Sequence, residues 1–249
     1  MRAYPYWKTL FVYTDSWLSP HHALILLAKT LQRSLHIQEV RQIVHHPDLT
    51  IEEEIPLLFL AENHASTAFI YQHLVSRFTH QKRYLLVLDT HLDIFSQEEN
   101  TETIHRGNFL RYLLKNGILE DHALLVPSLH SPVASLREGL SHLGEGLYYL
   151  SWDLDFGLPR CASFPSPLSL TFRELREIFR LIGSHFRKPR RHLIGMDIVE
   201  MNIDRPFHLS KLSFQITTLL QYLHLQKSPH FELPHLDRFN QKKYAKCGQ

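Results

Sequence analysis

The segment Tyr84-Leu85-Leu86-Val87-Leu88-Asp89-Thr90-His91-Leu92-Asp93 decides the fold, because it joins an apolar run to an Asp-x-His-x-Asp sequence. A continuous apolar run of this length indicates a strand that is buried on both faces, as in a parallel sheet covered by helices. Ligands of such sheets bind at the carboxyl ends of the strands. Because residues two apart in an extended chain point the same way, we expect Asp89, His91 and Asp93 to face one site.

Strand-like and helix-like segments alternate along the rest of the chain. Further strands are predicted at 9–13, 56–60, 123–126, 147–150 and 192–199, and helices at 22–35, 66–78, 108–114, 133–143, 171–182 and 209–225. The helix at 171–182 begins with Thr171-Phe172-Arg173-Glu174, which fits a capping box. The alternation predicts a three-layer α/β/α sandwich with a mainly parallel sheet.

The organisation of the chain is simple. Its 249 residues suffice for one large α/β domain, and neither an internal repeat nor a linker divides them. We expect a single domain over residues 1–226. Residues 227–249 contain Pro and His and end in Gln-Lys-Lys-Tyr-Ala-Lys-Cys-Gly-Gln, so they are expected to form a loosely attached tail.

The composition excludes several classes of protein. The hydrophobic fraction is 44% and the charged fraction 21%, which is ordinary for a globular chain. A net charge of +2 predicts no nucleic-acid partner, and the basic stretch 187–191 is interpreted as a solvated loop. The two cysteines exclude a disulfide-dense scaffold. No apolar run is long enough for a secretory signal or a membrane span, so we expect a cytoplasmic protein without a membrane partner.

Other predicted strands also lead into residues that bind metals. Asp153 and Asp155 follow the strand at 147–150, His64 follows the strand at 56–60, and Glu200 follows the strand at 192–199. Carboxylates gathered at one edge of a sheet repel each other unless cations compensate them. An oxygen-rich set with some imidazole suits two Mn²⁺ ions better than a structural zinc ion. The sequence therefore predicts metal-assisted hydrolysis, in which two bridged metals polarise a trapped water to hydroxide.

These motifs resemble those of the ureohydrolase superfamily, which contains arginase, agmatinase and formimidoylglutamase. Residues 61–66 (Ala-Glu-Asn-His-Ala-Ser) are similar to the family's Gly-Gly-Asp-His-Ser motif, and residues 89–93 to its Asp-Ala-His-x-Asp motif. Residues 151–155 are similar to its Ser-x-Asp-x-Asp motif, and residues 195–202 (Gly-Met-Asp-Ile-Val-Glu-Met-Asn) to its late Val-Glu-Val-Asn segment. The resemblance covers about residues 56–202 and implies an arginase-like fold.

The resemblance also implies a set of metal ligands. The six matching positions are His64, Asp89, His91, Asp93, Asp153 and Asp155. They would hold two Mn²⁺ ions per chain. One ion would be bound through His64 and Asp93, the other through His91 and Asp155, and Asp89 and Asp153 would bridge both.

Two further positions match catalytic residues of the family. His105, in His105-Arg106-Gly107-Asn108, takes the place of a histidine that shuttles protons, and Glu200 matches the acid that contacts the guanidinium-like group. The implied reaction is hydrolysis of a linear amidine or guanidino C–N bond by a hydroxide that bridges the metals. The implied substrate is a small cationic guanidino or formimino compound. Family members are oligomers, so a homo-oligomer is left open.

The chain departs from the family mainly on the substrate side. Ala61-Glu62-Asn63 replaces Gly-Gly-Asp, and residues 94–152, between Asp93 and Asp153, are too few for the family pattern. We therefore expect a shortened, divergent member that lacks about one strand–helix unit. Residues 62–64, 108–110 and 153–156 are also similar to a less characterised arginase-related family of unassigned activity.

Two alternatives stay open. The first is a different amide or amidine hydrolase on the same fold, including a deacetylase-like enzyme with one zinc ion. The filled positions His91 and Asp155 argue against a one-metal enzyme. The second is a non-catalytic metal-binding or oligomerisation protein that kept the fold and lost its substrate loops, and the altered turn before His64 favours it.

Overall fold

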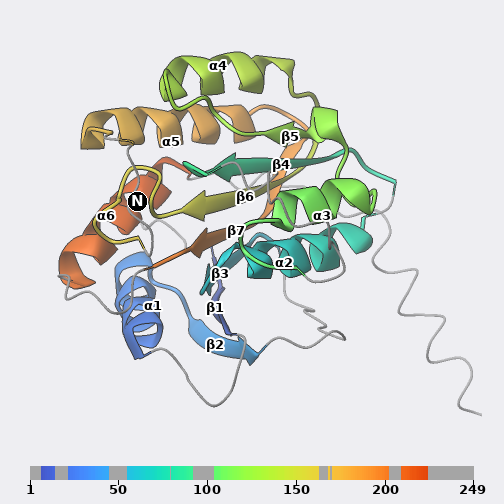
Figure 1. Cartoon of the computed structure of the whole chain (residues 1–249). Coiled ribbons are helices and arrows are strands. Elements are labelled where there is room, and N and C mark those ends of the chain that lie inside the picture. The colour runs from blue at the N-terminus through green and yellow to red at the C-terminus, as the bar shows by residue number, and fades with distance from the viewer. Residues whose placement is uncertain are drawn as a thin grey trace, which may run out of the picture.

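One parallel sheet organises the described part of the chain in the computed structural model (Figure 1). The structure describes residues 7–14, 22–44, 55–78, 80–91, 104–162, 168, 170–201 and 209–223. Its strands are β1 (Thr9–Thr14), β2 (Glu39–Val44), β3 (Leu57–Ala61), β4 (Arg83–Leu88), β5 (Leu124–Leu125), β6 (Gly146–Asp153) and β7 (Arg191–Val199). They lie in the order β2-β1-β3-β7-β6-β4-β5, and every neighbouring pair is parallel.

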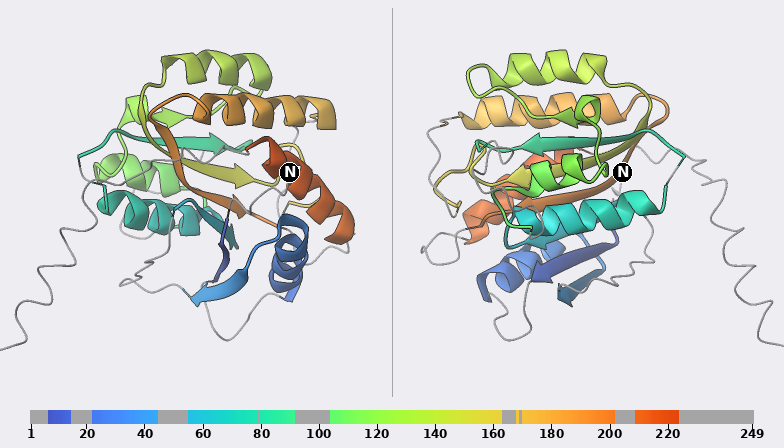
Figure 2. Two further views of the ribbon diagram at one scale, coloured as in Figure 1. Left: turned by 180° about the vertical axis from the view of Figure 1, so that it is seen from behind. Right: turned by 45° about the vertical axis from the view of Figure 1, so that its right-hand side comes forward.

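Helices cover both faces of the sheet (Figures 1 and 2). They are α1 (His22–Leu35), α2 (His64–Ser76), α3 (Phe109–Lys115), α4 (Pro132–His142), α5 (Phe172–Phe186) and α6 (Leu209–Tyr222), with a 3₁₀ turn at Asp121–Ala123. On one face α4 packs on α5, α5 on α6 and α6 on α1, and on the other face α2 packs on α3. The predicted three-layer α/β/α sandwich is therefore confirmed, and its sheet is wholly parallel within the described residues.

The core explains why the apolar runs were reliable predictors of strands. All residues of β1 and β3, and all but the first residues of β4 and β6, are buried, because helices exclude water from both faces. β2 was not predicted. Its sequence Glu-Val-Arg-Gln-Ile-Val mixes polar and apolar residues, because β2 lies at the edge of the sheet and is buried only in part.

The helix boundaries depend on local capping. The predicted capping box at the start of α5 is present, with Thr171 and Glu174 satisfying each other's backbone N–H groups. α2 begins two residues earlier than predicted, at His64 itself. None of the helices in the described part of the chain has the length and hydropathy needed to cross a bilayer. The predicted tail, 227–249, lies outside the described residues.

Candidate metal centre

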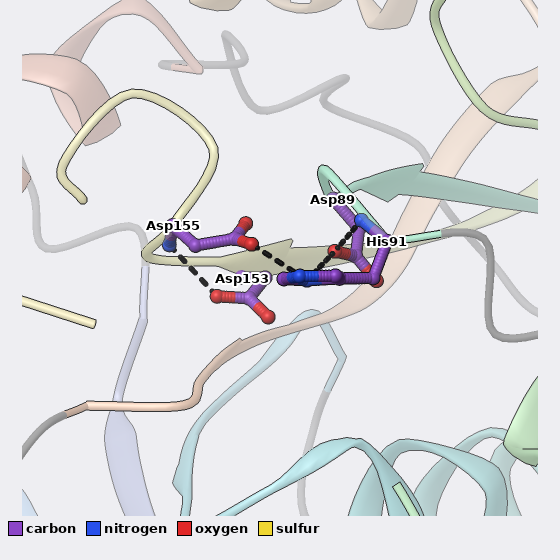
Figure 3. Close-up of side chains that lie close together, drawn as sticks. All are labelled: Asp89, His91, Asp153 and Asp155. Atoms are coloured by element: carbon purple, nitrogen blue, oxygen red, sulfur yellow. Dashed lines mark hydrogen bonds and ion pairs between the residues drawn. The ribbon is translucent and has the colours of Figure 1, made fainter. Parts of the chain in front are cut away.

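The pairing of β4 with β6 builds the centre of the site. Leu88 and Trp152 are register partners in these neighbouring strands, so the residues that follow them, Asp89 and Asp153, emerge side by side at the carboxyl edge. Figure 3 shows that Asp89 and His91 come from the segment after β4, whereas Asp153 and Asp155 come from the end of β6 and the turn beyond it. The sheet therefore brings Asp89 and Asp153 together, although they are 64 positions apart in the sequence.

The four side chains form a compact set of ligand atoms. Asp89, His91, Asp153 and Asp155 each offer one atom, and these atoms all lie within 4.8 Å of one another. The three aspartates are 1–4% exposed, while the His91 side chain is 48% exposed. His91 Nδ1 lies 2.9 Å from Asp155 Oδ2 and 3.6 Å from Asp89 Oδ1. The carboxylates are therefore buried in the protein, and His91 lies at the solvent-exposed side of the cluster.

Backbone and hydroxyl groups hold the carboxylates in place. The N–H of His91 donates to Asp89 Oδ1 at 2.7 Å, and the N–H of Asp155 donates to Asp153 Oδ1 at 2.8 Å. Each carboxylate thus accepts from the residue two positions later, which fixes its rotamer. The Thr90 hydroxyl and N–H both donate to Asp155. Thr90 was not among the predicted site residues, although a hydroxyl between two ligands was the available signal.

The electrostatics of the cluster favour a cation. Burial raises the pKa of Asp153 well above its usual range, and the neighbouring charges of Asp155 and Asp89 add to this rise. Burial and Asp89 also raise the pKa of Asp155. The carboxylates of Asp89 and Asp155 raise the pKa of His91 to about 9, against the effect of its partial burial. A hard divalent ion satisfies such a set, because it offers positive charge to several oxygens and one imidazole at once.

His64 lies at the inner side of the cluster. It is the first residue of α2 and is 1% exposed, and its Nδ1 lies 3.4 Å from Asp89 Oδ2. Its ring packs against Phe109, with 4.6 Å between the ring centroids. The turn before His64 does not need the glycines of the ureohydrolase motif, because Asn63 is extended and its side chain accepts from the N–H of Ala65 at 2.8 Å.

His105 lies in the turn that leads into α3. Its backbone N–H donates to the side chain of Asn108 at 2.8 Å, and its Nδ1 accepts from the N–H of Gly107 at 3.2 Å. The turn ends at Phe109, whose ring contacts His64. His105 is therefore held in one orientation by its own turn, on a segment that packs next to the cluster.

Glu200 and Asp93 complete the predicted set. Glu200 is 5% exposed and directly follows β7, whose last carbonyl, that of Val199, accepts from the N–H of Leu154 at 3.2 Å. Its φ of 60° lies in the left-handed region, which costs a residue with a Cβ about 1–3 kcal/mol. Asp93 lies outside the described residues.

Comparisons with known proteins find this fold in solved structures but find no relative by sequence. No protein-family model matches the sequence, and no curated protein matches it. Solved structures do match. Proclavaminate amidino hydrolase from Streptomyces clavuligerus superposes with a TM-score of 0.64 at 14% identity, over 88% of this chain and 93% of that one. Helicobacter pylori arginase gives 0.64 at 16% identity, over 86% of this chain and 98% of that one.

The chain has the arginase fold. A Trypanosoma cruzi formiminoglutamase variant with Mn²⁺ also shares it, with a TM-score of 0.60 at 13% identity, over 90% of this chain and 96% of that one. These solved structures are named as an amidino hydrolase, an arginase and a formiminoglutamase. For this chain, likeness at such low identity establishes the arginase fold, and the chemistry has to come from its own residues.

Proposed function

We propose that this chain is a metal-dependent hydrolase of the ureohydrolase superfamily, and a shortened and divergent member of it. The observation that carries the proposal is the compact set of Asp89, His91, Asp153 and Asp155 at the carboxyl edge of an arginase-type sheet. Open parallel sheets bind their ligands at this edge. Four solved structures with the same fold are named as an amidino hydrolase, an arginase, an agmatinase and a formiminoglutamase.

The proposed cofactor is a pair of Mn²⁺ ions. Three carboxylates and one imidazole are the donors that manganese accepts readily, whereas structural zinc prefers sulfur and imidazole. The proposed ligands are His64, Asp89, His91, Asp93, Asp153 and Asp155. Bound ions of this kind supply Lewis acidity and lower the pKa of water at neutral pH.

The chain's own residues supply recognition and proton transfer in this proposal. Glu200 directly follows β7, whose last carbonyl accepts from the N–H of Leu154, and its buried carboxylate would orient a cationic guanidino or formimino group. His105 would carry a proton to the amine that leaves, since an imidazole exchanges protons near neutral pH. The substrate proposed is therefore a small cation with a linear amidine or guanidino C–N bond.

The geometry weighs against the two alternatives. His91 and Asp155, which the resemblance assigns to the second metal position, both belong to the cluster, so the residues proposed for that position lie together. Asn63 caps the turn that holds His64 without glycine, so the altered turn no longer favours a non-catalytic protein that lost its substrate loops. Homo-oligomerisation and a cytoplasmic location stay predictions of the sequence.

The proposal is tested by a screen for product release. Protein loaded with Mn²⁺ is incubated with arginine, agmatine, guanidinobutyrate and formimidoylglutamate, and urea, ammonia and formamide are assayed. We expect turnover of at least one of these compounds, and loss of that turnover in Asp153→Asn. The Glu177→Gln variant is the matched control, because Glu177 pairs with Arg180 on the exposed surface of α5. Turnover that survives in Asp153→Asn would refute the mechanism.

A further inference from the structure

Asp197 is a buried carboxylate that the proposed mechanism does not use. It lies in β7 and is 0% exposed. The Ser151 hydroxyl donates to Asp197 Oδ1 at 2.6 Å, and the Tyr149 hydroxyl donates to Asp197 Oδ2 at 2.8 Å. The Thr67 and Ser151 hydroxyl oxygens are 3.3 Å apart, so Thr67 extends this network into α2.

The network joins the two elements that carry inner residues of the metal centre. Ser151 lies two residues before Asp153 in β6, so the two side chains point to the same face of the sheet. Thr67 lies three residues after His64, on the same side of α2. Ser151 and Asp197 are register partners in β6 and β7. Asp197 therefore lies directly behind the metal centre, between the segment that presents His64 and the strand that presents Asp153.

A carboxylate that is fully buried, such as that of Asp197, is unusual in a protein core. Burying a carboxylate is costly unless hydrogen bonds and opposite charge compensate it, and an apolar side chain of similar size would fill the space without that cost. Burial raises the pKa of Asp197, while Ser151, His64, Tyr149 and Thr67 oppose the rise.

We propose that Asp197 is a positioning residue for the metal centre, which fixes α2 against β6 through Thr67 and Ser151 and so holds His64 and Asp153 at the spacing that a metal requires. The inference rests on the proposed function, because it assumes that these two residues bind a metal. Carboxylates that orient metal ligands commonly contribute 10- to 100-fold to metal affinity. The same contribution is expected of Asp197.

The experiment measures Mn²⁺ affinity by calorimetric titration and the melting temperature of the metal-free protein in parallel. Asp197→Asn keeps the shape of the side chain and removes its charge. We expect it to weaken Mn²⁺ binding by about 10- to 100-fold and to change the metal-free melting temperature little, because the amide nitrogen loses one hydrogen bond from a hydroxyl while a buried charge is also removed. A purely structural role would produce the opposite result, a lower melting temperature with unchanged affinity.

A double-mutant cycle locates the route of the effect. Ser151→Ala is expected to weaken Mn²⁺ binding by about tenfold, and Asp197→Asn combined with Ser151→Ala to bind no more weakly than Asp197→Asn alone, since both act through one hydrogen bond. Tyr148→Phe is the matched control. It removes a buried hydroxyl that donates to the Gly144 carbonyl at the opposite end of β6, so Mn²⁺ affinity should stay within about twofold of wild type.

The outcomes separate this inference from the proposed function. If wild-type protein binds no Mn²⁺, the proposed function fails, and the inference fails with it. If wild type binds Mn²⁺ and Asp197→Asn binds it within twofold, the inference is overturned while the proposed function stands. Should Asp197→Asn fail to fold, Ser151→Ala decides instead. Weakened binding in that variant but not in Tyr148→Phe supports the inference, and equal binding in both overturns it.

Discussion

Two histidines at opposite ends of the strands, His91 and His185, have very different surroundings. His91 follows the carboxyl end of β4, and His185 lies in α5 over the amino ends of β6 and β7. At the carboxyl edge, the carboxylates of Asp89 and Asp155 raise the pKa of His91 to about 9. At the amino edge, burial and the charge of Arg191 lower the pKa of His185 to about 3. His185 accepts from Arg191 Nη1 at 2.9 Å, and its ring lies 5.0 Å from that of Tyr148.

His185 is part of the packed core, whereas His91 is part of the candidate metal centre. Around His185 the imidazole is neutral, aromatic rings surround it, and its Nδ1 is satisfied by Arg191. Around His91, ligand atoms of three carboxylates lie within 4.8 Å of one another, and like charges this close are unfavourable unless a cation compensates them. A high count of histidines in the sequence therefore carries little information, whereas the charges that face each histidine carry much.

The largest effect is expected where the negative charge is removed from the carboxyl edge. Asp153→Asn should lower metal-dependent turnover at least about 100-fold, because the carboxylate would bridge both ions. Without metal, Asp153→Asn should be no less stable than wild type. Burial raises the pKa of Asp153, which means that its charged form is disfavoured in the folded protein, and Asn carries no charge. Steady-state kinetics and thermal melting check the two halves, and a large loss of metal-free stability would contradict the account.

Added Mn²⁺ should stabilise the folded protein, and this effect should depend on the cluster at the carboxyl edge of the sheet. Mn²⁺ at 100 times its dissociation constant is expected to stabilise wild type by about 3 kcal/mol and to raise its melting temperature by roughly 5–10 °C. EDTA should reverse the shift. Calorimetric scans with and without metal test this, and an equal shift in Asp153→Asn would mean that Mn²⁺ binds elsewhere.

Acid should lower the free energy of unfolding through His185, at the amino ends of the strands. Because the pKa of His185 is about 3 when folded and near 6.5 when unfolded, its contribution to stability is complete above pH 6.5 and is lost as pH falls toward 3. The loss amounts to about 3 kcal/mol between pH 6.5 and pH 4. Urea unfolding of metal-free His185→Gln should lack this pH dependence. His122→Gln, at an exposed position, is the control and should keep it.

The smallest expected effect is the loss of a helix N-cap, at Asn63 or at Thr171. Asn63→Ala removes the cap of α2, and Thr171→Ala removes the cap of α5, and each should cost about 1 kcal/mol of stability. Only Asn63→Ala should also weaken Mn²⁺ binding, because α2 begins at His64. Denaturant unfolding together with metal titration compares the two variants. The same metal affinity in both would show that the cap does not position His64.

Much of this fold could be predicted from the sequence because apolar runs mark strands that are buried on both faces. The edge strand β2 could not, because it is buried only in part and its sequence has no apolar run. That Asp89, His91, Asp153 and Asp155 would meet at one site could be predicted, because each lies at or just after the end of a strand. That β4 lies beside β6, which brings them together, depends on long-range packing that no local pattern contains.

The supporting residues of the site were harder to predict. Thr90 and Asn63 act through hydrogen bonds to neighbours whose positions only the folded chain defines. Asp197 belongs to a segment of the ureohydrolase resemblance, yet only its burial and its hydroxyl partners set it apart from a surface acid. Polar residues inside a strand carry no periodic signal, so their partners had to come from the structure.

The central claim, that the carboxyl edge holds metal ions through the Asp/His cluster, is tested most directly by metal stoichiometry. Wild type and Asp153→Asn are loaded with Mn²⁺, dialysed, and analysed by inductively coupled plasma mass spectrometry. The account predicts about two manganese ions per wild-type chain and fewer than one in the variant. No retained metal in wild type, or the same amount in both proteins, would contradict it.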